Sequence, residues 1–431
     1  MFEVFRNAWK DTNLRKKILY TLFIIVIFRF GSNIFVPFLD MSVIKDLMGD
    51  ESLLSFLDTM TGGSLSNGTL LAMSITPYIN ASIIIQLLAV AIPALEKLQK
   101  EGDEGRKRLN LITKFTSLGL AIMQAIGFYF LLRARGAVKY TEGFDGVLTA
   151  ITIVICFVAG ASLIIWLGDQ INEKGIGNGI SIILFAGIVA RMPSSVFSLV
   201  QLMTADMKNA ILVPIVGIIF IVMIGLVVLM TNAERRIPVQ YAKRVVGRKM
   251  YGGQSSFIPI KVAMAGVMPI IFAMSVMALP QTICSFFGIY GDGSSGNEFW
   301  EGFVRLFSQS SWLYAILYFL LIIAFNYFYI AIQYNPVEIA NNLKKNNGAI
   351  PGIRPGKPTA DFINNSLSKI SLIGAMFLAF IAIFPIIFRQ LTNINISLGG
   401  TTMLILVGVA LETVRSLESQ MMMRHHKGFL E

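Results

Sequence analysis

The sequence has few of the residues that enzymes and soluble domains use for chemistry and solubility. Only 14% of its 431 residues are charged, against 55% that are hydrophobic, and it has two cysteines and two histidines. Cys156 and Cys284 lie far apart in apolar surroundings, and such a pair forms neither a disulfide framework nor a metal site. The sequence also has no phosphate-cradling glycine loop with its lysine, and no nucleophile with a paired base. It therefore predicts a protein that is not an enzyme and that uses no metal or other cofactor.

Carboxylates are missing from the centres of the apolar runs. Arg29 is the one charge deep in such a run, and charges of this kind usually face the interior of a helix bundle. A proton or ion relay needs more than one ionisable residue. The pattern argues against an ion-coupled transporter and favours a structural role for Arg29, such as a hydrogen bond to a carbonyl.

The chain does have many apolar runs of about the ~20 residues that a bilayer crossing needs. We predict a polytopic membrane protein with ten spans, at residues 17–37, 76–93, 111–132, 147–168, 179–191, 211–231, 263–283, 313–334, 367–388 and 400–417. The net charge of +11 is gathered on one side of these spans, in segments such as 15–17, 106–108 and 235–249. The positive-inside rule places that side, and both termini, in the cytoplasm. Anionic lipids are natural partners for so much positive charge.

The spans divide into two sets of five, which makes the second set inverted relative to the first. We predict an N-terminal half at 1–190, an external hinge connection at 191–210 and a C-terminal half at 211–431. Inverted halves are common in secondary transporters. A transporter for a small solute is therefore the alternative to a channel, and a membrane-anchored scaffold is a third possibility.

The second span is preceded by a stretch that cannot cross a bilayer as a helix. Residues 62–68, GGSLSNG, are flexible and polar, and Pro77 then restarts the chain as a helix. Irregular backbone is tolerated at membrane depth only inside protein or a watery cavity. We predict a short segment, about 62–73, folded into the bundle, followed by a helix with Ile75, Ile79, Ser82 and Gln86 on one face.

Two cytoplasmic connections, about 232–262 and 335–366, are longer than topology requires. The first is basic, and its apolar residues around Gly247 suggest a hairpin. The second contains Pro351 to Gly356, a rigid turn that displays Arg354. Phosphate-rich or acidic partners are the natural complement of such loops.

These segments resemble the SecY family, the pore subunits of the bacterial protein-conducting channel, over nearly the whole chain. The motifs that carry the resemblance are ITPYINASIIIQLL (75–88), EGDEGRKR (101–108), WLGDQINEKGIGNGIS (166–181), RRIPVQYAKR (235–244), GRKMYGGQS (247–255), NPVEIANNLKK (335–345) and IPGIRPGKPT (350–359). The resemblance implies an all-α fold of ten transmembrane helices. Two inverted five-helix halves would surround an hourglass pore, with a broken second helix forming a plug and a lateral gate between the second and seventh spans.

The resemblance also implies roles for individual residues. The pore ring would be Ile75, Ile79, Ile180, Leu184, Ile271 and Ile405. The plug would include Gly62, Gly63, Ser64, Leu65, Ser66, Asn67, Gly68, Leu70 and Leu71. The lateral gate would include Asn80, Ser82, Gln86, Ala263 and Leu279. Family members commonly carry asparagine where this chain has Ala263, so we expect Gln86 to have fewer polar partners and the signal-sequence requirement to be shifted.

The basic loops match the family's docking surface for the ribosome and the SecA motor ATPase, at Lys243, Arg244, Arg248, Lys249 and Arg354. The resemblance further implies the small membrane subunits SecE and SecG as partners, and unfolded preproteins with their signal sequences as substrates. It predicts a passive protein-conducting channel in the bacterial plasma membrane that also releases hydrophobic segments sideways into the bilayer.

Overall fold

The computed structural model of the protein describes residues 6, 9–47, 58, 61–205, 207–241, 244–246, 249–251, 255–286, 298–307, 311–392 and 400–425. The helices of the first half are α2 (Thr12–Gly31), α3 (Met41–Leu47), α5 (Thr76–Ala91), α6 (Pro93–Lys100), α7 (Asp103–Ala134), α8 (Gly143–Lys174) and α9 (Gly179–Ala205). Those of the second half are α10 (Met207–Asn232), α11 (Met268–Phe286), α12 (Glu298–Leu306), α13 (Trp312–Gln333), α14 (Pro336–Lys345), α15 (Lys357–Thr392) and α16 (Gly400–His425).

Each of the ten predicted spans falls on one of these helices, so the mostly helical fold class is confirmed. By length and hydropathy alone, six helices among the described residues could cross a membrane, or seven if the bent pair α5 and α6 is one span. The bend in that pair is 107° and lies between Ala91 and Pro93. The count of ten spans agrees with the helix order but stays a prediction.

Several helix boundaries differ from the sequence prediction, and three of the differences matter for the site. The polar stretch from 191 to 209, expected as a connection, is helical apart from residue 206, which lies outside the described residues. Ser194 and Ser198 in this stretch donate to carbonyls three and four residues earlier, which satisfies their hydroxyls within the helix. Helix α15 begins at Lys357, before the predicted 367, and α11 begins at Met268 after turns from 262 to 267. The division of the chain into halves near 191–210 remains a prediction.

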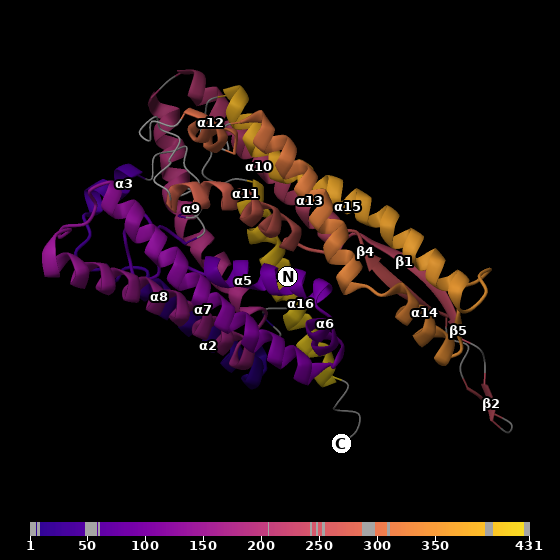
Figure 1. Ribbon diagram of the computed structural model, residues 1–431. Helices are drawn as coiled ribbons and strands as arrows, with labels where there is room; N and C mark the ends of the chain where they lie inside the picture. The colour runs from indigo at the N-terminus through magenta and orange to yellow at the C-terminus, as the bar shows by residue number, and fades with distance from the viewer. Residues whose placement is uncertain are drawn as a thin grey trace.

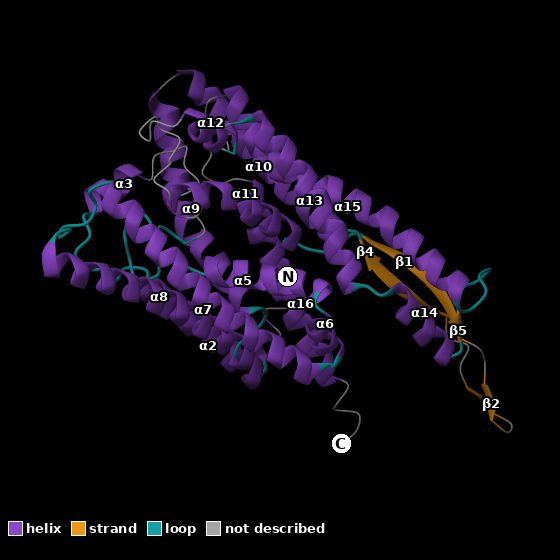
Figure 2. Cartoon of the chain, viewed as in Figure 1, coloured by secondary structure: helices purple, strands orange, loops and turns teal. Residues whose placement is uncertain are grey.

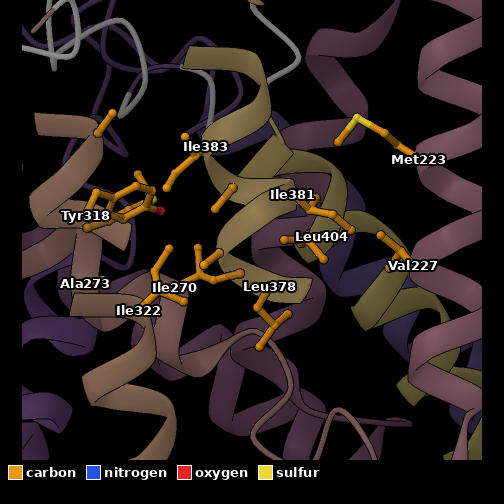
Figure 3. Packing of buried hydrophobic residues seen from close by; sticks show 14 of the residues in the cluster. Met223, Val227, Ile270, Ala273, Tyr318, Ile322, Leu378, Ile381, Ile383 and Leu404 are labelled. Atoms are coloured by element: carbon orange, nitrogen blue, oxygen red, sulfur yellow. The ribbon is translucent and has the colours of Figure 1, made fainter. Parts of the chain in front are cut away.

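The two sets of helices lie side by side (Figure 1), with α2, α5, α7 and α8 on one side and α11, α13 and α15 on the other. Helix α16 contacts α9, α10 and α15, so it joins the two sets. The largest apolar cluster packs α10, α11, α13, α15 and α16 together, and Figure 3 shows Tyr318, Ile322 and Leu378 among its side chains. Close packing of this kind makes these five helices a rigid unit.

Strands occur at one end of the molecule (Figure 2), in the predicted cytoplasmic loops. They are β1 (Glu234–Tyr241), β2 (Arg244–Val246), β3 (Lys249–Tyr251), β4 (Ser255–Lys261) and β5 (Gly348–Ala349). The antiparallel sheet has the order β4-β1-β5, and β2 pairs with β3 across 247–248. The predicted hairpin around Gly247 is thus confirmed by the strand pairing, whereas the pairing of β5 with β1 was not predicted.

Candidate pore, plug and gate

The six aliphatic residues predicted for the ring meet in one apolar cluster. Ile75, Leu184, Ile271 and Ile405 are buried members, at 0%, 5%, 7% and 1% exposed, and Ile79 and Ile180 pack against them while partly buried. They come from the start of α5, the start of α9, the start of α11 and the start of α16. Four helices that lie far apart in the sequence therefore converge on one aliphatic cluster.

The position of Ile180 and Leu184 is fixed by the turn before α9. The Asn178 side chain accepts from the backbone N–H of Ile180 at 3.1 Å, and that of Asn172 accepts from Gly179 at 2.8 Å. A Cβ at Gly179 would collide with the carbonyl of Gly168 on α8. The glycine lets α9 begin directly against α8, with Ile180 and Leu184 one turn apart on the face that joins the cluster.

An irregular segment of turns at residues 61–75, here called the plug segment after the predicted plug, ends at this cluster. Leu71 is 1% exposed and belongs to the same cluster as the ring, with Leu70 packed against it. Two backbone hydrogen bonds join the segment to the chain after α2, from Val36 to the Gly68 carbonyl at 3.0 Å and from Leu70 to the Ile34 carbonyl at 2.8 Å. The expectation of a short non-helical segment folded into the bundle before Pro77 agrees with this geometry.

Two glycines let the plug segment approach its walls. A Cβ at Gly160 on α8 would collide with the Leu70 carbonyl, and one at Gly31 would lie 2.9 Å from Leu71 Cδ1. Any larger side chain at these positions would push against the segment. The fit is therefore steric as well as apolar.

Polar groups tie the plug segment to the walls on two sides. Arg29 of α2 donates from Nη1 to the Gly62 carbonyl at 3.0 Å, which confirms the structural role predicted for this residue. Arg191 of α9 forms an ion pair with Asp58, with 2.6 Å between Nη2 and Oδ2. Sequence reasoning missed this pair, because Arg191 was expected in a connection outside the bundle.

The predicted gate residues are brought together only in part. Gln86 donates to the Ser82 hydroxyl at 3.2 Å along one face of α5, and Asn80 lies on the same helix, partly buried. Helix α11 contacts α5 and α7, and it carries Leu279, which is 49% exposed. Ala263 lies in the turns before α11, partly buried, and not on the helix as the predicted span had it.

Three of the five predicted docking residues, Arg244, Lys249 and Arg354, lie at the strand-bearing end of the molecule. Arg354 is exposed in the turn before α15, where Gly352 and Gly356 adopt left-handed φ angles of 81° and 108°. Thr359 Oγ1 donates to the Arg354 carbonyl at 2.8 Å and fixes this turn. Arg244 and Lys249 lie in β2 and β3, and Lys243 and Arg248 lie outside the described residues. The pairing of β5 with the end of β1 joins the strand that precedes this turn to the strand that precedes the hairpin.

The sheet is attached to the helices at the base of β1. Arg415 of α16 donates to the Thr231 carbonyl and to Asn232 Oδ1, both at 2.8 Å, where α10 ends. Burial, and then the nearby positive charge of Arg415, lower the pKa of Lys261 at the end of β4. Arg415 thus links α16 to the end of α10, directly before the sheet begins.

Helices that converge on an aliphatic cluster, with an irregular segment folded against it, agree with the pore ring and plug expected from the sequence. The family model described as SecY matches residues 69–414. The protein translocase subunit SecY of Streptomyces galbus is 40% identical to this chain over 446 aligned residues and is matched over 100% of both chains. The chain therefore belongs to the SecY family.

Two solved structures share the fold. One comes from work described as showing that the plug domain of the SecY protein stabilises the closed state of the translocation channel and maintains a membrane seal. It has a TM-score of 0.65 at 19% identity and covers 95% of this chain and 93% of that chain. The other is Sec61 in the canine ribosome-channel complex from the endoplasmic reticulum, with a TM-score of 0.60 at 18% identity and the same coverage.

Proposed function

We propose that unfolded secretory polypeptides cross the membrane through the ring of Ile75, Ile79, Ile180, Leu184, Ile271 and Ile405, and that hydrophobic segments leave sideways between α5 and α11. Membership in the SecY family makes the chain a multi-pass protein translocation channel and not an enzyme. The proposed path through the ring is supported by one observation. Four helices meet at one aliphatic cluster, and Leu71 of the plug segment packs in the same cluster.

The chemistry of the ring suits a pore for many sequences. An apolar constriction can exclude ions by dewetting, and aliphatic side chains make no specific hydrogen bond that would favour one polypeptide over another. At the lateral gate, the hydrophobicity of a polypeptide segment determines whether it partitions into the lipid or stays in the channel. Ten central Leu, Ile, Phe or Val residues, at roughly 0.3 to 0.6 kcal/mol each, supply about 3 to 6 kcal/mol toward lipid.

The driving energy comes from partners that dock on the strand-bearing end. We assign Lys243, Arg244, Arg248, Lys249 and Arg354 to a surface for the SecA motor ATPase and the ribosome, with SecE and SecG as small membrane subunits. Anionic lipids would contact the basic side of the spans. The charge distribution supports a location in the bacterial plasma membrane with both termini in the cytoplasm.

Translocation by the reconstituted protein tests this function. Vesicles that contain the chain with SecE and SecG are mixed with SecA, ATP and a secretory precursor, and the precursor protected from added protease is measured. Protection that needs both ATP and an intact signal sequence is the expected result. Uptake of small solutes without any precursor protection would contradict the proposal.

Reversing the charge of Arg354 should reduce this translocation by about tenfold or more. Arg354 is exposed on a fixed turn. Placing like charges across an interface costs several kcal/mol. Since about 1.4 kcal/mol changes an affinity tenfold, the loss of binding should be at least that large. The measurement compares SecA binding and precursor protection for Arg354→Glu and for Lys139→Glu, a reversal at an exposed residue on the predicted external side. Equal losses in the two variants would contradict a docking role for Arg354.

A further inference from the structure

The plug segment must leave the constriction before a polypeptide can pass, so the contacts that hold it decide how easily the channel opens. Leu71 supplies apolar contact with the ring. Apolar contact alone has no direction and can be replaced by the apolar core of any entering signal sequence. A charged contact cannot be replaced in that way.

Asp58 is bound to the plug segment at several points. Its Oδ1 accepts from the Ser66 backbone N–H at 2.7 Å. Its carbonyl accepts from the Gly63 N–H at 2.9 Å and from Thr61 Oγ1 at 3.0 Å. Through these bonds Asp58 and residues 61–66 form one hydrogen-bonded unit, and whatever holds Asp58 holds the plug segment.

The other carboxylate oxygen of Asp58 binds a wall helix. Oδ2 lies 2.6 Å from Nη2 of Arg191, and the Asp58 side chain is 2% exposed while that of Arg191 is 29% exposed. A carboxylate so far removed from water depends on its cationic partner. The same stretch of α9 touches the segment elsewhere, because a Cβ at Gly62 would lie 3.0 Å from the Gly187 carbonyl oxygen and one at Gly63 would lie 3.4 Å from Arg191 Nε.

We propose that the Asp58–Arg191 ion pair positions the plug segment against α9 and thereby sets how strong a signal sequence must be to open the channel. The effect on signal strength rests on the proposed function, whereas the ion pair between Asp58 and Arg191 does not. Arg29 holds Gly62 from α2, on another wall, through a backbone carbonyl. Arg191 differs because its partner is a charge, and losing either partner leaves the other unpaired.

Replacing Asp58 and replacing Arg191 should not have equal effects on channel opening. Asp58→Asn keeps an acceptor for the Ser66 N–H and leaves Arg191, which is partly exposed, to be hydrated. Arg191→Gln leaves the Asp58 carboxylate buried and unpaired, and that carboxylate regains water when the segment moves out. Arg191→Gln should therefore open the channel more than Asp58→Asn. The double variant should open it less than the sum of the two single effects, because the unpaired buried charge is gone.

The position of the segment can be measured without any translocation. In a background with Cys156 and Cys284 replaced by alanine, a single cysteine is placed at Leu65, which is 5% exposed in the plug segment. The rate at which a membrane-impermeant maleimide labels it from outside reports release of the segment. We expect about a tenfold faster rate in Arg191→Gln, a smaller increase in Asp58→Asn, and a rate near that of the parent in Arg191→Lys, which keeps the charge.

A second cysteine tests whether the substitutions loosen the helix bundle in general. Placed at Ile153 of α8, which is 0% exposed and packs in a different apolar cluster, it should be labelled at the same slow rate in every variant. Equal acceleration at both cysteines would mean that the ion pair stabilises the fold in general, and would overturn the proposal. Labelling at Leu65 within about twofold of the parent in both neutral variants would overturn it as well.

Export of precursor proteins then tests the predicted effect on the signal-sequence requirement. The variants should export a precursor with a weakened signal sequence more efficiently than the parent protein, in the same order as their labelling rates. Faster labelling without this gain would overturn the link to signal strength. Failure of the parent to export a precursor with an intact signal would instead contradict the proposed function, and the labelling rates would still decide whether the ion pair holds the segment.

Discussion

Vesicles that contain a variant with Ile75 and Ile405 both replaced by asparagine should become permeable to small ions. These two residues are 0% and 1% exposed, they lie directly before α5 and in α16, and they belong to the cluster proposed as the constriction. Amide side chains there would hold water where the aliphatic ring excludes it. We expect ion flux to rise by at least about tenfold, which needs a barrier lower by only about 1.4 kcal/mol.

A matched control separates the ring from ordinary core. Ile153→Asn also places an amide at a fully buried isoleucine, but in a cluster that does not include the ring. It should destabilise the protein without making intact channels conduct. Volume-conserving leucine at positions 75 and 405 should keep the barrier. Similar leaks from the Ile153 variant and the ring variant would mean that misfolding, and not wetting of the constriction, opens the path.

Enlarging Gly160 should displace the plug segment. A Cβ at this position would collide with the Leu70 carbonyl, one residue before Leu71 in the ring cluster, so Gly160→Ala forces either α8 or the segment to move. Overpacking of this kind typically costs about 1 to 3 kcal/mol. We expect higher ion leakage and export of precursors with weaker signals, measured in the same vesicles.

Gly119→Ala is the control for this variant. An added Cβ at Gly119 in α7 would meet no described atom within 4 Å other than its chain neighbours and its own helix backbone. The same substitution there therefore meets open space and improves helix propensity. It should behave like the parent protein. If Gly160→Ala also behaves like the parent, the plug segment does not depend on its close approach to α8.

Much of the fold follows from local sequence. Pro77 lies in the first turn of α5, the charged residues separate the apolar runs, and the residues around Gly247 form the β2–β3 hairpin. A hydrogen bond from Arg29 was predictable, because a lone charge at membrane depth needs an acceptor. That the acceptor is the Gly62 carbonyl was not predictable. For Ile180, Ile271 and Ile405, the residues alone indicate only core, and the family resemblance supplied the expectation that they meet.

Other features depend on contacts between distant segments, which periodicity cannot reveal. Arg191 was expected in a polar connection because polar and charged residues interrupt the apolar runs between 191 and 209. In the structure α9 continues to Ala205, so Arg191 lies inside the helix and reaches Asp58. Likewise β5 consists of Gly348 and Ala349 alone and gains its partner only from the fold.

The most direct test of the central claim is photocrosslinking from Ile271, whose side chain belongs to the ring cluster on α11. A photoreactive residue is placed there in membranes with SecE and SecA, and a secretory precursor is stalled midway by a folded C-terminal domain. Phe115 on α7, which is 69% exposed, is the lipid-facing control. A crosslink from position 271 that requires SecA and ATP, with none from position 115, is the predicted result. No crosslink from position 271, despite membrane insertion and SecA binding, would contradict passage of the polypeptide through this ring.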